Sequence, residues 1–253
     1  MQDFKGRHVL VTGGGTGIGA AISRGFAAGG AKVAIHYHAG KAAADKLVAE
    51  IAGQGGHAVA LGADLTAPNA PADLVARTVT ALGGLDILVN NAGGMVGRRP
   101  LAEIDDAFID EVFDLNVRST VHCCRMALPH LTASGKGVIV NVSSVSARTG
   151  GSPGSSIYSG AKGFISTFTR SLARELAPNG IRVNAVSPGT IHTDFHVRHS
   201  TPEKLEATRK TIPQMRLGTA EDCAGTVLYL CDDTLSGYVT GQVIEVNGGQ
   251  LMA

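Results

Sequence analysis

Short apolar runs alternate with stretches of helical periodicity along the whole chain. The runs are rich in Val and Ile, have the length of strands and lie at residues 8–12, 32–37, 57–62, 86–90, 137–142, 181–187 and 242–246. Between them, apolar residues recur at three- and four-residue spacings, which predicts helices over 17–29, 41–53, 70–82, 105–132, 156–177 and 220–231. This order of strands and helices is typical of an α/β protein with a parallel sheet.

The predicted strands are apolar at consecutive positions instead of at alternate ones. Such strands are buried on both faces, so helices should cover the sheet on each side. We therefore expect a three-layer α/β/α fold of about seven strands in a doubly wound, Rossmann-like arrangement. Ligands bind these sheets beyond the carboxyl ends of the strands, at the point where the strand order reverses.

The composition excludes several classes of protein. The 253 residues carry a formal net charge of +1 without runs of like charge, which argues against nucleic-acid and membrane-surface partners. Residues 1–7 are polar and no apolar run approaches the ~20 residues of a membrane helix, so we expect no signal peptide and no membrane span, and predict a cytoplasmic protein. The composition is uniform along the chain and no linker is visible, which predicts a single domain over residues 1–253. With nucleic acids and membranes disfavoured by the charge, we expect a small-molecule ligand.

Cysteine and histidine do not form the spacings of a metal site. The cysteines lack paired ligand spacing and are expected to be buried free thiols: Cys123, Cys124, Cys223 and Cys231. Three histidines lie close together in the sequence, namely His192, His196 and His199. No carboxylate or cysteine completes a ligand set with them, so we expect no bound metal.

A glycine-rich turn follows the first predicted strand and opens the first predicted helix. It reads Thr-Gly-Gly-Gly-Thr-Gly-Ile-Gly over residues 12–19. Glycines in this place let the backbone approach a pyrophosphate closely, while the helix start directs its amides at the anion. Because a strand precedes it and a helix follows it, the turn predicts a dinucleotide site.

Tyr158 and Lys162 lie four residues apart in a predicted helix, which puts a phenol and an ammonium on one face. A unit positive charge about 5 Å from a phenol is worth roughly 3 kcal/mol at an effective dielectric constant of about 20. We therefore expect Lys162 to lower the pKa of Tyr158 by about two units from its ordinary value of about 10. Such a tyrosine is a general acid or base, so the pair predicts a proton-transfer enzyme.

The order of motifs resembles the short-chain dehydrogenase/reductase family over nearly the whole chain. The spacing Thr-Gly-x-x-x-Gly-x-Gly begins at Thr12, Asn-Asn-Ala-Gly occupies residues 90–93, and a serine pair precedes the tyrosine and lysine. The resemblance implies a catalytic tetrad of Asn116, Ser144, Tyr158 and Lys162. It also implies a larger coenzyme-binding set: Thr12, Gly13, Gly15, Thr16, Gly17, Ile18, Gly19, Tyr37, His38, Lys41, Asp64, Leu65, Asn90, Ala92, Gly93, Tyr158, Lys162, Pro188, Gly189, Ile191 and Thr193.

The resemblance gives each tetrad residue a role. Tyr158 donates a proton to a carbonyl oxygen as hydride reaches the carbonyl carbon, and Ser144 supplies a second hydrogen bond. Lys162 binds the nicotinamide ribose in addition to tuning the tyrosine. Asn116 holds a water on the proton path.

Other family roles fall on the coenzyme set. Asp64 resembles the residue that binds adenine, and Asn90 resembles the one that steadies the central sheet. Pro188-Gly189 and Thr193 resemble the segment that holds the nicotinamide carboxamide.

Three serines, Ser143, Ser144 and Ser146, leave the choice of catalytic serine open, and we select Ser144. The interval from Ser144 to Tyr158 is one residue longer than is common in similar enzymes. Glycines and Pro153 in the loop 149–154 could absorb this residue.

The end of the second predicted strand should decide the coenzyme. An acidic residue there would accept hydrogen bonds from the ribose hydroxyls of NAD, but Tyr37 stands in its place. A 2′-phosphate is then admissible, and His38 and Lys41 could supply donors or charge, so we expect NADP(H) in preference to NAD(H). NAD(H) stays open, because Thr16 stands where many NADP-dependent relatives carry a basic residue, and Lys41 could be a solvated side chain at a helix start.

Two segments, 91–106 and 188–196, are locally similar to reductases of alginate-derived keto-uronates. If that similarity carries over, Arg98 or Arg99 binds a substrate carboxylate. The alternative is that both arginines are solvated or hold a loop in place. Ser146 and His192 are further candidates for substrate contact.

The stretch around 190–217 is polar and is expected to be a substrate lid. The chain is only 4% aromatic and has no Trp, which leaves few side chains for stacking on bulky rings. A polar carbonyl or alcohol compound is therefore expected in preference to a steroid or a long acyl chain.

The leading interpretation is a carbonyl or keto-sugar reductase that interconverts a carbonyl and a secondary alcohol. A 3-oxoacyl thioester reductase is the alternative among enzymes, because basic residues at the pocket mouth could steer a phosphopantetheine carrier: Arg98, Arg99, Arg148 and Lys136. A catalytically silent dinucleotide-binding redox sensor is the alternative from another class, and the intact tetrad argues against it.

Residues 241–249 read as an edge strand, and exposed edges tend to be paired or covered. Relatives commonly assemble through this strand and the two long helices, 105–132 and 156–177. We expect a homotetramer.

Overall fold

The computed structural model describes residues 3–193 and 200–252, and a parallel sheet forms its centre. The strands are β1 (His8–Val11), β2 (Lys32–Tyr37), β3 (His57–Gly62), β4 (Ile87–Asn90), β5 (Val138–Val142), β6 (Arg182–Pro188) and β7 (Val243–Val246). Their order across the sheet is β3-β2-β1-β4-β5-β6-β7, and every neighbouring pair is parallel. The predicted strands and the doubly wound fold are confirmed.

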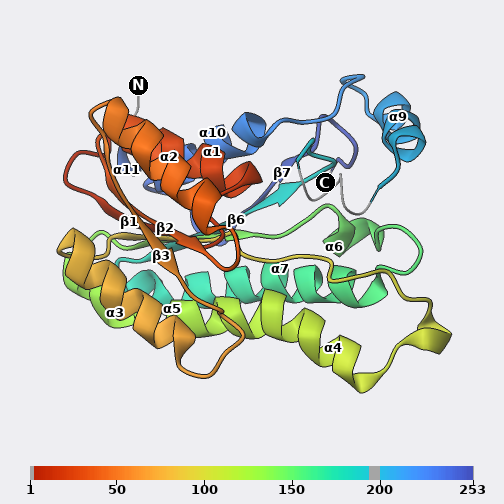
Figure 1. The fold of residues 1–253 in the computed structure, drawn as a ribbon, viewed down its shortest axis with the longest axis horizontal. Helices are drawn as coiled ribbons and strands as arrows, with labels where there is room; N and C mark the ends of the chain where they lie inside the picture. Colours follow the sequence, from red (N-terminus) through yellow and green to blue (C-terminus); the bar gives the residue numbers. More distant parts are fainter. Residues whose placement is uncertain (1–2, 194–199, 253) are drawn as a thin grey trace.

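Helices cover the sheet on both faces (Figure 1). One face carries α1 (Gly17–Ala28), α2 (Lys41–Gly53), α10 (Ala220–Cys231) and α11 (Asp233–Ser236). The other face carries α3 (Ala70–Leu82), α4 (Asp106–Phe113), α5 (Ser119–Ser134) and α7 (Ser156–Leu176). Shorter elements are η1 (Leu101–Glu103), α6 (Ser146–Thr149), η3 (Ala177–Asn179) and α9 (Pro202–Thr211). Among the described residues, no helix has both the length and the apolar character to cross a membrane.

The helix that the sequence predicts over 105–132 is interrupted. Its α4 part ends at Phe113, residues Asp114–Arg118 form a π-helical turn, and α5 begins at Ser119. A π-turn carries an extra residue in one turn of helix and is frequent at functional sites. Periodicity does not reveal it, because a shift of one residue is hard to distinguish within a pattern that already mixes three- and four-residue spacings.

Local signals explain where the helices begin and end. Thr219 and Asp222 form a capping box at the start of α10, in which each side chain accepts a hydrogen bond from the other residue's main-chain N–H. α3 carries Pro71 in its first turn and ends at Gly83, whose φ of +91° suits glycine.

Alternate residues of the central strands enter opposite cores. Val9 and Val11 of β1 pack with the layer of α1, α2 and α10, while Leu10 packs with the layer of α3, α5 and α7. All three side chains are fully buried, and each contributes roughly 1.5–3 kcal/mol relative to exposure. Burial on both faces is why the strand sequences are apolar at consecutive positions.

The strand order reverses between β1 and β4, and polar bonds join the segments that leave these strands. Thr12 Oγ1 accepts hydrogen bonds from the main-chain N–H groups of Asn91 and Ala92, each at 3.0 Å. Asn91 Nδ2 donates to the carbonyls of Thr12 and Gly13, also at 3.0 Å. The glycine turn is therefore tied to the Asn-Asn-Ala-Gly segment at the reversal point.

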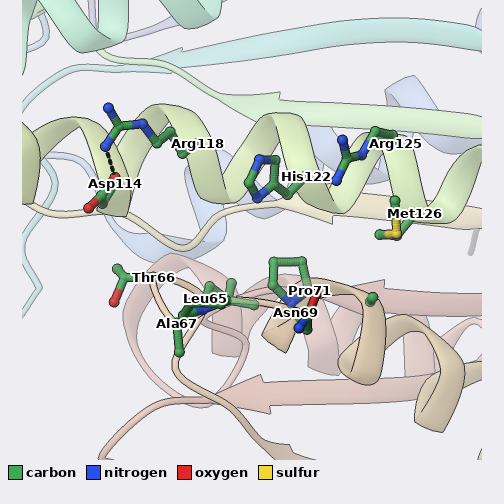
Figure 2. Close-up of a pocket in the computed structure, with 12 residues that line it drawn as sticks. Leu65, Thr66, Ala67, Asn69, Pro71, Asp114, Arg118, His122, Arg125 and Met126 are labelled. Carbon is green, nitrogen blue, oxygen red and sulfur yellow. Dashed lines mark hydrogen bonds and ion pairs between the residues drawn. The ribbon is translucent and has the colours of Figure 1, made fainter.

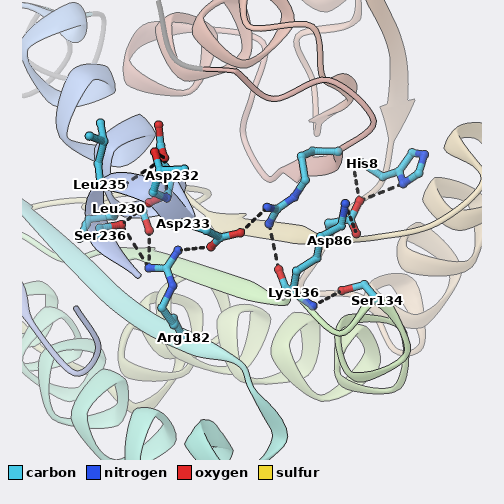
Figure 3. A network of polar contacts seen from close by, with 12 residues as sticks. His8, Asp86, Ser134, Lys136, Arg182, Leu230, Asp232, Asp233, Leu235 and Ser236 are labelled. Atoms are coloured by element: carbon cyan, nitrogen blue, oxygen red, sulfur yellow. Dashed lines mark hydrogen bonds and ion pairs between the residues drawn. The ribbon is translucent and has the colours of Figure 1, made fainter. Parts of the chain in front are cut away.

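An ion network closes the opposite end of the sheet, where the strands begin (Figure 3). The Asp233 carboxylate accepts hydrogen bonds from Arg7 Nη1 and from Arg182 Nη2, both at 2.7 Å. The arginine side chains are only 9% and 11% exposed, and that of Asp233 is 45% exposed. Burial raises the pKa of Asp233, but the hydrogen bonds from Arg182 and Arg7 outweigh it and hold the pKa below its ordinary value.

We expect Asp233→Ala to lower the free energy of unfolding by roughly 1–3 kcal/mol, because two mostly buried guanidinium groups lose their acceptor. A group with a lowered folded-state pKa stabilises the protein above its unfolded pKa, and that stability is lost as the pH falls through the folded pKa. Urea unfolding of the wild type and of the variant should therefore converge as the pH is lowered from about 5 toward about 3. Asp233→Asn, which keeps an acceptor but not the charge, should fall between the two. A difference that stayed constant with pH would contradict this account.

Candidate active site

The four candidate tetrad residues come from three places in the fold. Asn116 lies in the π-turn, Ser144 follows β5, and Tyr158 and Lys162 are one turn apart on α7. Asn116 and Lys162 are buried, while Ser144 and Tyr158 are partly exposed. The structure thus brings the four residues to the carboxyl side of β4 and β5, where a doubly wound sheet binds its ligand.

Asn116 holds the main chain of Gly94. Its Nδ2 donates to the Gly94 carbonyl at 2.9 Å, and its Oδ1 accepts from the Gly94 N–H at 3.1 Å. The same Nδ2 donates to the Val112 carbonyl at 2.9 Å, one turn earlier in the helix. From the π-turn, the fully buried Asn116 amide thus bonds both to the helix and to the loop after β4.

Lys162 is buried beside the loop that Asn116 holds. Its Nζ donates to the Val142 carbonyl at 2.9 Å, and burial lowers the pKa of Lys162 to about 8. A Cβ added to Gly93 would lie 2.7 Å from Asn116 Oδ1 and 3.1 Å from Lys162 Nζ. Glycine at position 93 is therefore required by close packing between two tetrad residues.

The serines divide into two roles. Ser144 makes a hydrogen bond with Tyr158, and Ser144 Oγ accepts from the Ser146 main chain at 3.2 Å and from Ser146 Oγ at 3.0 Å. Ser143 points elsewhere, with its Oγ donating to the Lys162 carbonyl at 3.0 Å and contacting Ser166 Oγ at 2.7 Å. Of the serines that the sequence left open, Ser144 is thus the one beside the phenol, and Ser146 supports it.

The predicted lowering of the Tyr158 pKa by Lys162 is wrong. Burial raises the pKa of Tyr158 to about 12, and the hydrogen bond from Ser144 opposes this without overcoming it. Lys162 Nζ lies 5.8 Å from the centre of the tyrosine ring and donates to a carbonyl instead of to the phenol oxygen. The four-residue spacing places the two groups on one helix face, but burial of each side chain has a larger effect on its pKa than the charge of its neighbour.

The glycine turn fits a pyrophosphate. Gly13 and Gly17 have φ values of +60° and +51°, in the left-handed region that favours glycine. Thr16 stands at the N-cap of α1 without a side-chain capping bond, and the first turn carries no acidic residue. The first amides of α1 are thus left available for an anion, with Gly15 and Ile18 in the same turn.

Two members of the predicted coenzyme set are buried structural residues. Thr12 is 1% exposed and uses its hydroxyl at the reversal point, so its contribution is to hold the turn. Asn90 is 3% exposed, and its Nδ2 donates to Asn141 Oδ1 on β5 at 2.9 Å. Ala92 and Gly93 continue from it toward Lys162.

The predicted adenine end lies beyond β2 and β3. Tyr37 packs its ring over Gly62, since a Cβ at Gly62 would lie 2.9 Å from the phenol oxygen. His38 is exposed, and its Nε2 lies 3.9 Å from an Asp64 carboxylate oxygen. Hydrogen bonds from the side chain and main chain of Thr66 hold the pKa of Asp64 below its ordinary value. Leu65, next to Asp64, is buried in the core.

Lys41 is paired within its own helix. Its ammonium donates to Asp45 at 2.6 Å, four residues along α2. The side chain is 69% exposed. This arrangement matches the alternative of a solvated lysine at a helix start.

The predicted nicotinamide segment follows β6. Pro188 ends that strand, Gly189 packs against Asn247, and Ile191 is buried. Thr193 lies over the glycine turn, with its Cγ2 3.5 Å from the position of a Cβ at Gly17. The predicted lid around 190–217 includes residues 194–199, which lie outside the described residues. His196 and His199 are among them.

The loop after β4 lies beside Tyr158. Val96 has a φ of +62°, and Gly97 N–H donates to the Met95 carbonyl at 2.7 Å, so residues 95–97 form a γ-turn of the rare left-handed kind. Val96 belongs to the same apolar cluster as Tyr158. A β-branched residue in this conformation stores strain, which proteins commonly keep at functional sites.

The two candidate substrate arginines differ in their contacts. Arg99 Nη1 donates to Asp105 at 3.0 Å, and its guanidinium stacks 4.5 Å over the Phe108 ring. Arg98 Nη1 makes a long bond of 3.4 Å to the Pro153 carbonyl, and its Nε is buried with no hydrogen-bond partner among the described residues. Arg99 therefore holds the loop, which was the alternative for these arginines, and Arg98 has one donor, Nε, without a partner among the described residues.

Three further candidates make contacts outside the tetrad. His192 is exposed and bonds through its main chain to Gly218. Lys136 precedes β5, with Nζ 3.9 Å from Asp86, so it lies at the opposite end of that strand from Ser144. The prediction that Lys136 borders the pocket mouth is wrong. Arg148 follows Ser146 on α6 and lies 4.0 Å from Glu245.

A groove of about 380 Å³ lies away from the tetrad, between the segment after β3 and helix α5 (Figure 2). Leu65 and Pro71 line one side, and Arg118, His122 and Arg125 line the other. None of the four tetrad residues lines it. A second hollow of about 340 Å³ lies between Ile191, Arg216 and Asn247, next to the predicted nicotinamide segment.

Sequence reasoning missed the polar residues that support the site. The sequence assigns no role to Asn91, Asn141 or His36. In the structure, each makes a buried or half-buried hydrogen bond: Asn91 to the Thr12 carbonyl, Asn141 to Asn90, and His36 to the Gly13 N–H. The available signal was a polar residue inside an apolar run, as at His36 in β2 and Asn141 in β5.

Comparisons with known proteins agree with this geometry. A family model described as Enoyl-(Acyl carrier protein) reductase matches residues 13–250. A 3-oxoacyl-[acyl-carrier-protein] reductase of Synechocystis sp. is 37% identical over 255 residues, which cover 100% of this chain and 100% of that protein. The solved structure of an NADH-dependent reductase A1-R′ responsible for alginate metabolism aligns with a TM-score of 0.91 and 35% identity, covering 98% of each chain. A short chain dehydrogenase of Burkholderia cenocepacia in complex with NADP aligns with a TM-score of 0.89 and 35% identity, covering 97% of this chain and 98% of that one.

We expect Gly93→Ala to lower kcat/KM for carbonyl reduction by about 100-fold or more, because the added methyl must displace Asn116 or Lys162. Gly53→Ala is the matched control, since a Cβ at the end of α2 meets nothing within 4 Å. Steady-state rates of both variants, with melting temperatures, make the comparison. Wild-type rates in Gly93→Ala would show that the packing around Lys162 does not matter for the reaction.

Proposed function

Because the chain belongs to the short-chain dehydrogenase/reductase family of oxidoreductases, we propose that it reduces a small polar carbonyl compound to a secondary alcohol with Tyr158 as the proton donor. The observation that carries the proposal is the hydrogen bond between Tyr158 and Ser144 beside the buried ammonium of Lys162. These are the groups that carbonyl reduction requires, namely an acid, a second donor to the oxygen and a nearby positive charge.

The chain's own residues move the proton and stabilise charge. A bound nicotinamide dinucleotide supplies the hydride that reaches the carbonyl carbon. Tyr158 gives its phenolic proton to the carbonyl oxygen, on which negative charge develops, and Ser144 donates a hydrogen bond to the same atom. Ser146 donates to Ser144 Oγ, and Ser144 in this structure donates to Tyr158, so Ser144 turns its proton to the carbonyl oxygen when substrate binds. With a pKa of about 8, Lys162 stays mainly protonated at neutral pH and stabilises the tyrosinate that is left.

We infer a preference for NADP(H) over NAD(H). Tyr37, not a carboxylate, ends β2, so nothing at that position repels a 2′-phosphate. The His38 side chain is 70% exposed and can donate to it. Lys41 contributes less than its sequence position suggests, because Asp45 already neutralises it. Relatives of both kinds exist, one named as NADH-dependent and another solved with NADP.

The substrate class that fits best is a keto-sugar acid. Arg98, in the loop beside Tyr158, makes one long bond through Nη1 and has its Nε without a hydrogen-bond partner among the described residues, and a guanidinium binds a carboxylate with two parallel bonds. The A1-R′ reductase, which is named for alginate metabolism, is similar over nearly the whole chain. Reduction of a 3-oxoacyl thioester is the second candidate, because the Synechocystis relative carries that name and Arg148 is exposed near Ser146.

We also propose a homotetramer. β7 is the last strand of the sheet and pairs only with β6 within the described residues, which leaves an edge for a second copy. On α7, Phe164 is 41% exposed and stacks on Phe168 with ring centres 5.7 Å apart. An exposed aromatic side chain on a long helix is a typical contact between subunits.

The first test is turnover of NADPH and NADH with keto-uronates, acetoacetyl thioesters and simple activated ketones, using wild type and Tyr158→Phe. We expect wild-type reduction of at least one class and a loss of at least about 1,000-fold in kcat for the variant, which retains dinucleotide binding. Dinucleotide binding by wild type without turnover of any substrate would instead favour a redox sensor.

Coenzyme choice has a separate test in His38→Asp. The new carboxylate should repel a 2′-phosphate and accept bonds from ribose hydroxyls, so kcat/KM for NADPH should fall about tenfold or more while that for NADH changes little. His57→Asp, at the exposed start of β3, is the control for added charge alone. An unchanged ratio of the two coenzymes would remove His38 from the argument.

Light scattering should give the mass of four 25.9 kDa chains for the wild type. Phe164→Lys should yield a smaller species, because it buries a charge in the proposed contact between α7 helices. Leu101→Lys changes another exposed apolar residue, outside the long helices, and should leave the mass unchanged. A monomeric wild type would refute the assembly.

A further inference from the structure

His36 is a buried histidine in a strand that is otherwise apolar apart from its ends. It lies on β2, is 3% exposed and has two ring contacts. Its Nδ1 lies 3.0 Å from the main-chain nitrogen of Gly13, and its Nε2 lies 3.0 Å from the Ala63 carbonyl oxygen. A main-chain N–H can only donate and a carbonyl can only accept, so the ring is neutral and carries its proton on Nε2.

These two bonds join segments that meet different parts of a dinucleotide. Gly13 belongs to the turn that fits the pyrophosphate, and Ala63 immediately precedes Asp64 at the predicted adenine end. The main chain of His36 adds a third bond, because its carbonyl accepts from the Gly14 N–H at 2.9 Å. One residue therefore holds two consecutive glycines and the end of β3.

Glycines need such support more than other residues do. Gly13 and Gly14 have no side chains of their own to anchor the turn, and a free glycine chain samples many conformations. Ordering them when a ligand binds would cost affinity, and a turn that is already ordered avoids this cost. The left-handed φ of Gly13, +60°, is thus maintained by a bond from its own N–H to an imidazole.

We propose that His36 is a positioning residue for the coenzyme, whose neutral ring holds the pyrophosphate turn and the adenine segment in their binding arrangement. This inference rests on the proposed function, because it takes residues 13–19 to bind a dinucleotide. His36 itself touches only the main chain of the site.

The same geometry predicts how dinucleotide affinity changes with pH. A proton added to Nδ1 would point at the Gly13 N–H and remove its acceptor, so the imidazolium is incompatible with the turn. Burial lowers the pKa of His36 most strongly, the Ala63 carbonyl raises it, the charges of His38 and Arg77 lower it further and Asp64 raises it, with a net lowering. Dinucleotide affinity should therefore be constant around neutral pH and fall in acid, below the ordinary histidine pKa of about 6.5.

The test measures NADPH binding by its fluorescence, without substrate, in wild type, His36→Leu, His36→Asn and His57→Leu. We expect a dissociation constant about tenfold or more higher for His36→Leu and a partial return in His36→Asn, whose amide oxygen can accept from Gly13. His57→Leu, which alters an exposed histidine, should bind as wild type does. At saturating NADPH, kcat should be nearly unchanged in His36→Leu, because the tetrad is untouched.

A second measurement uses the wild-type protein alone and does not depend on any variant folding. Nitrogen-15 NMR of the histidine ring should give the Nε2–H tautomer for His36, and the weakening of NADPH binding in acid should follow its protonation. The Nδ1–H tautomer, or equal affinity in His36→Leu and wild type, would overturn the inference and leave the proposed function standing. Absence of any binding of NADPH or NADH by the wild type would overturn both.

Discussion

The hydrogen bonds between Thr12 and Asn91 hold the point on which the rest of the site depends. β1 and β4 pair with each other, but the helices that follow them cover opposite faces of the sheet. The main-chain N–H groups just beyond the paired residues therefore need new hydrogen-bond acceptors. Thr12 Oγ1 accepts from the main-chain N–H groups of Asn91 and Ala92. The Asn91 side chain in turn donates to the carbonyls of Thr12 and Gly13. The glycine turn and the loop that carries Gly93 are thereby built as one unit.

Burial, more than proximity, sets the electrostatics of this unit. Lys162 and Tyr158 share a helix face as their spacing predicts, yet desolvation moves both pKa values toward the neutral forms, to about 8 and about 12. A phenol with a high pKa keeps its proton until charge develops on a substrate oxygen, which suits an acid in the reducing direction. Ser144 and Lys162 then matter chiefly for the tyrosinate and the developing oxyanion, not for the resting phenol.

The sequence predicts the sheet and the glycine turn because each follows from a short-range pattern, whereas the full tetrad is implied by the resemblance to a family. Consecutive apolar residues report burial on both faces, and the turn at 12–19 and the pair Tyr158 and Lys162 have meaning at fixed spacing. The π-turn at Asn116, the pairing of Arg99 with Asp105 and the role of His36 depend on contacts between segments far apart in the chain. In the sequence, such contacts are indicated at most by a polar residue at a position where an apolar one is expected.

The two halves of the site also differ in how closely the fold determines them. The dinucleotide half consists largely of main chain, held by buried polar side chains such as Thr12 and His36. The proposed substrate half consists of loops, where Val96 is held in a strained γ-turn beside Tyr158 and Arg98 Nε has no hydrogen-bond partner among the described residues. Strain and unpaired donors cost stability, and a fold retains them where a ligand uses them. The sheet and its buried core fix the fold without selecting a substrate, which is why one fold can serve many carbonyl compounds.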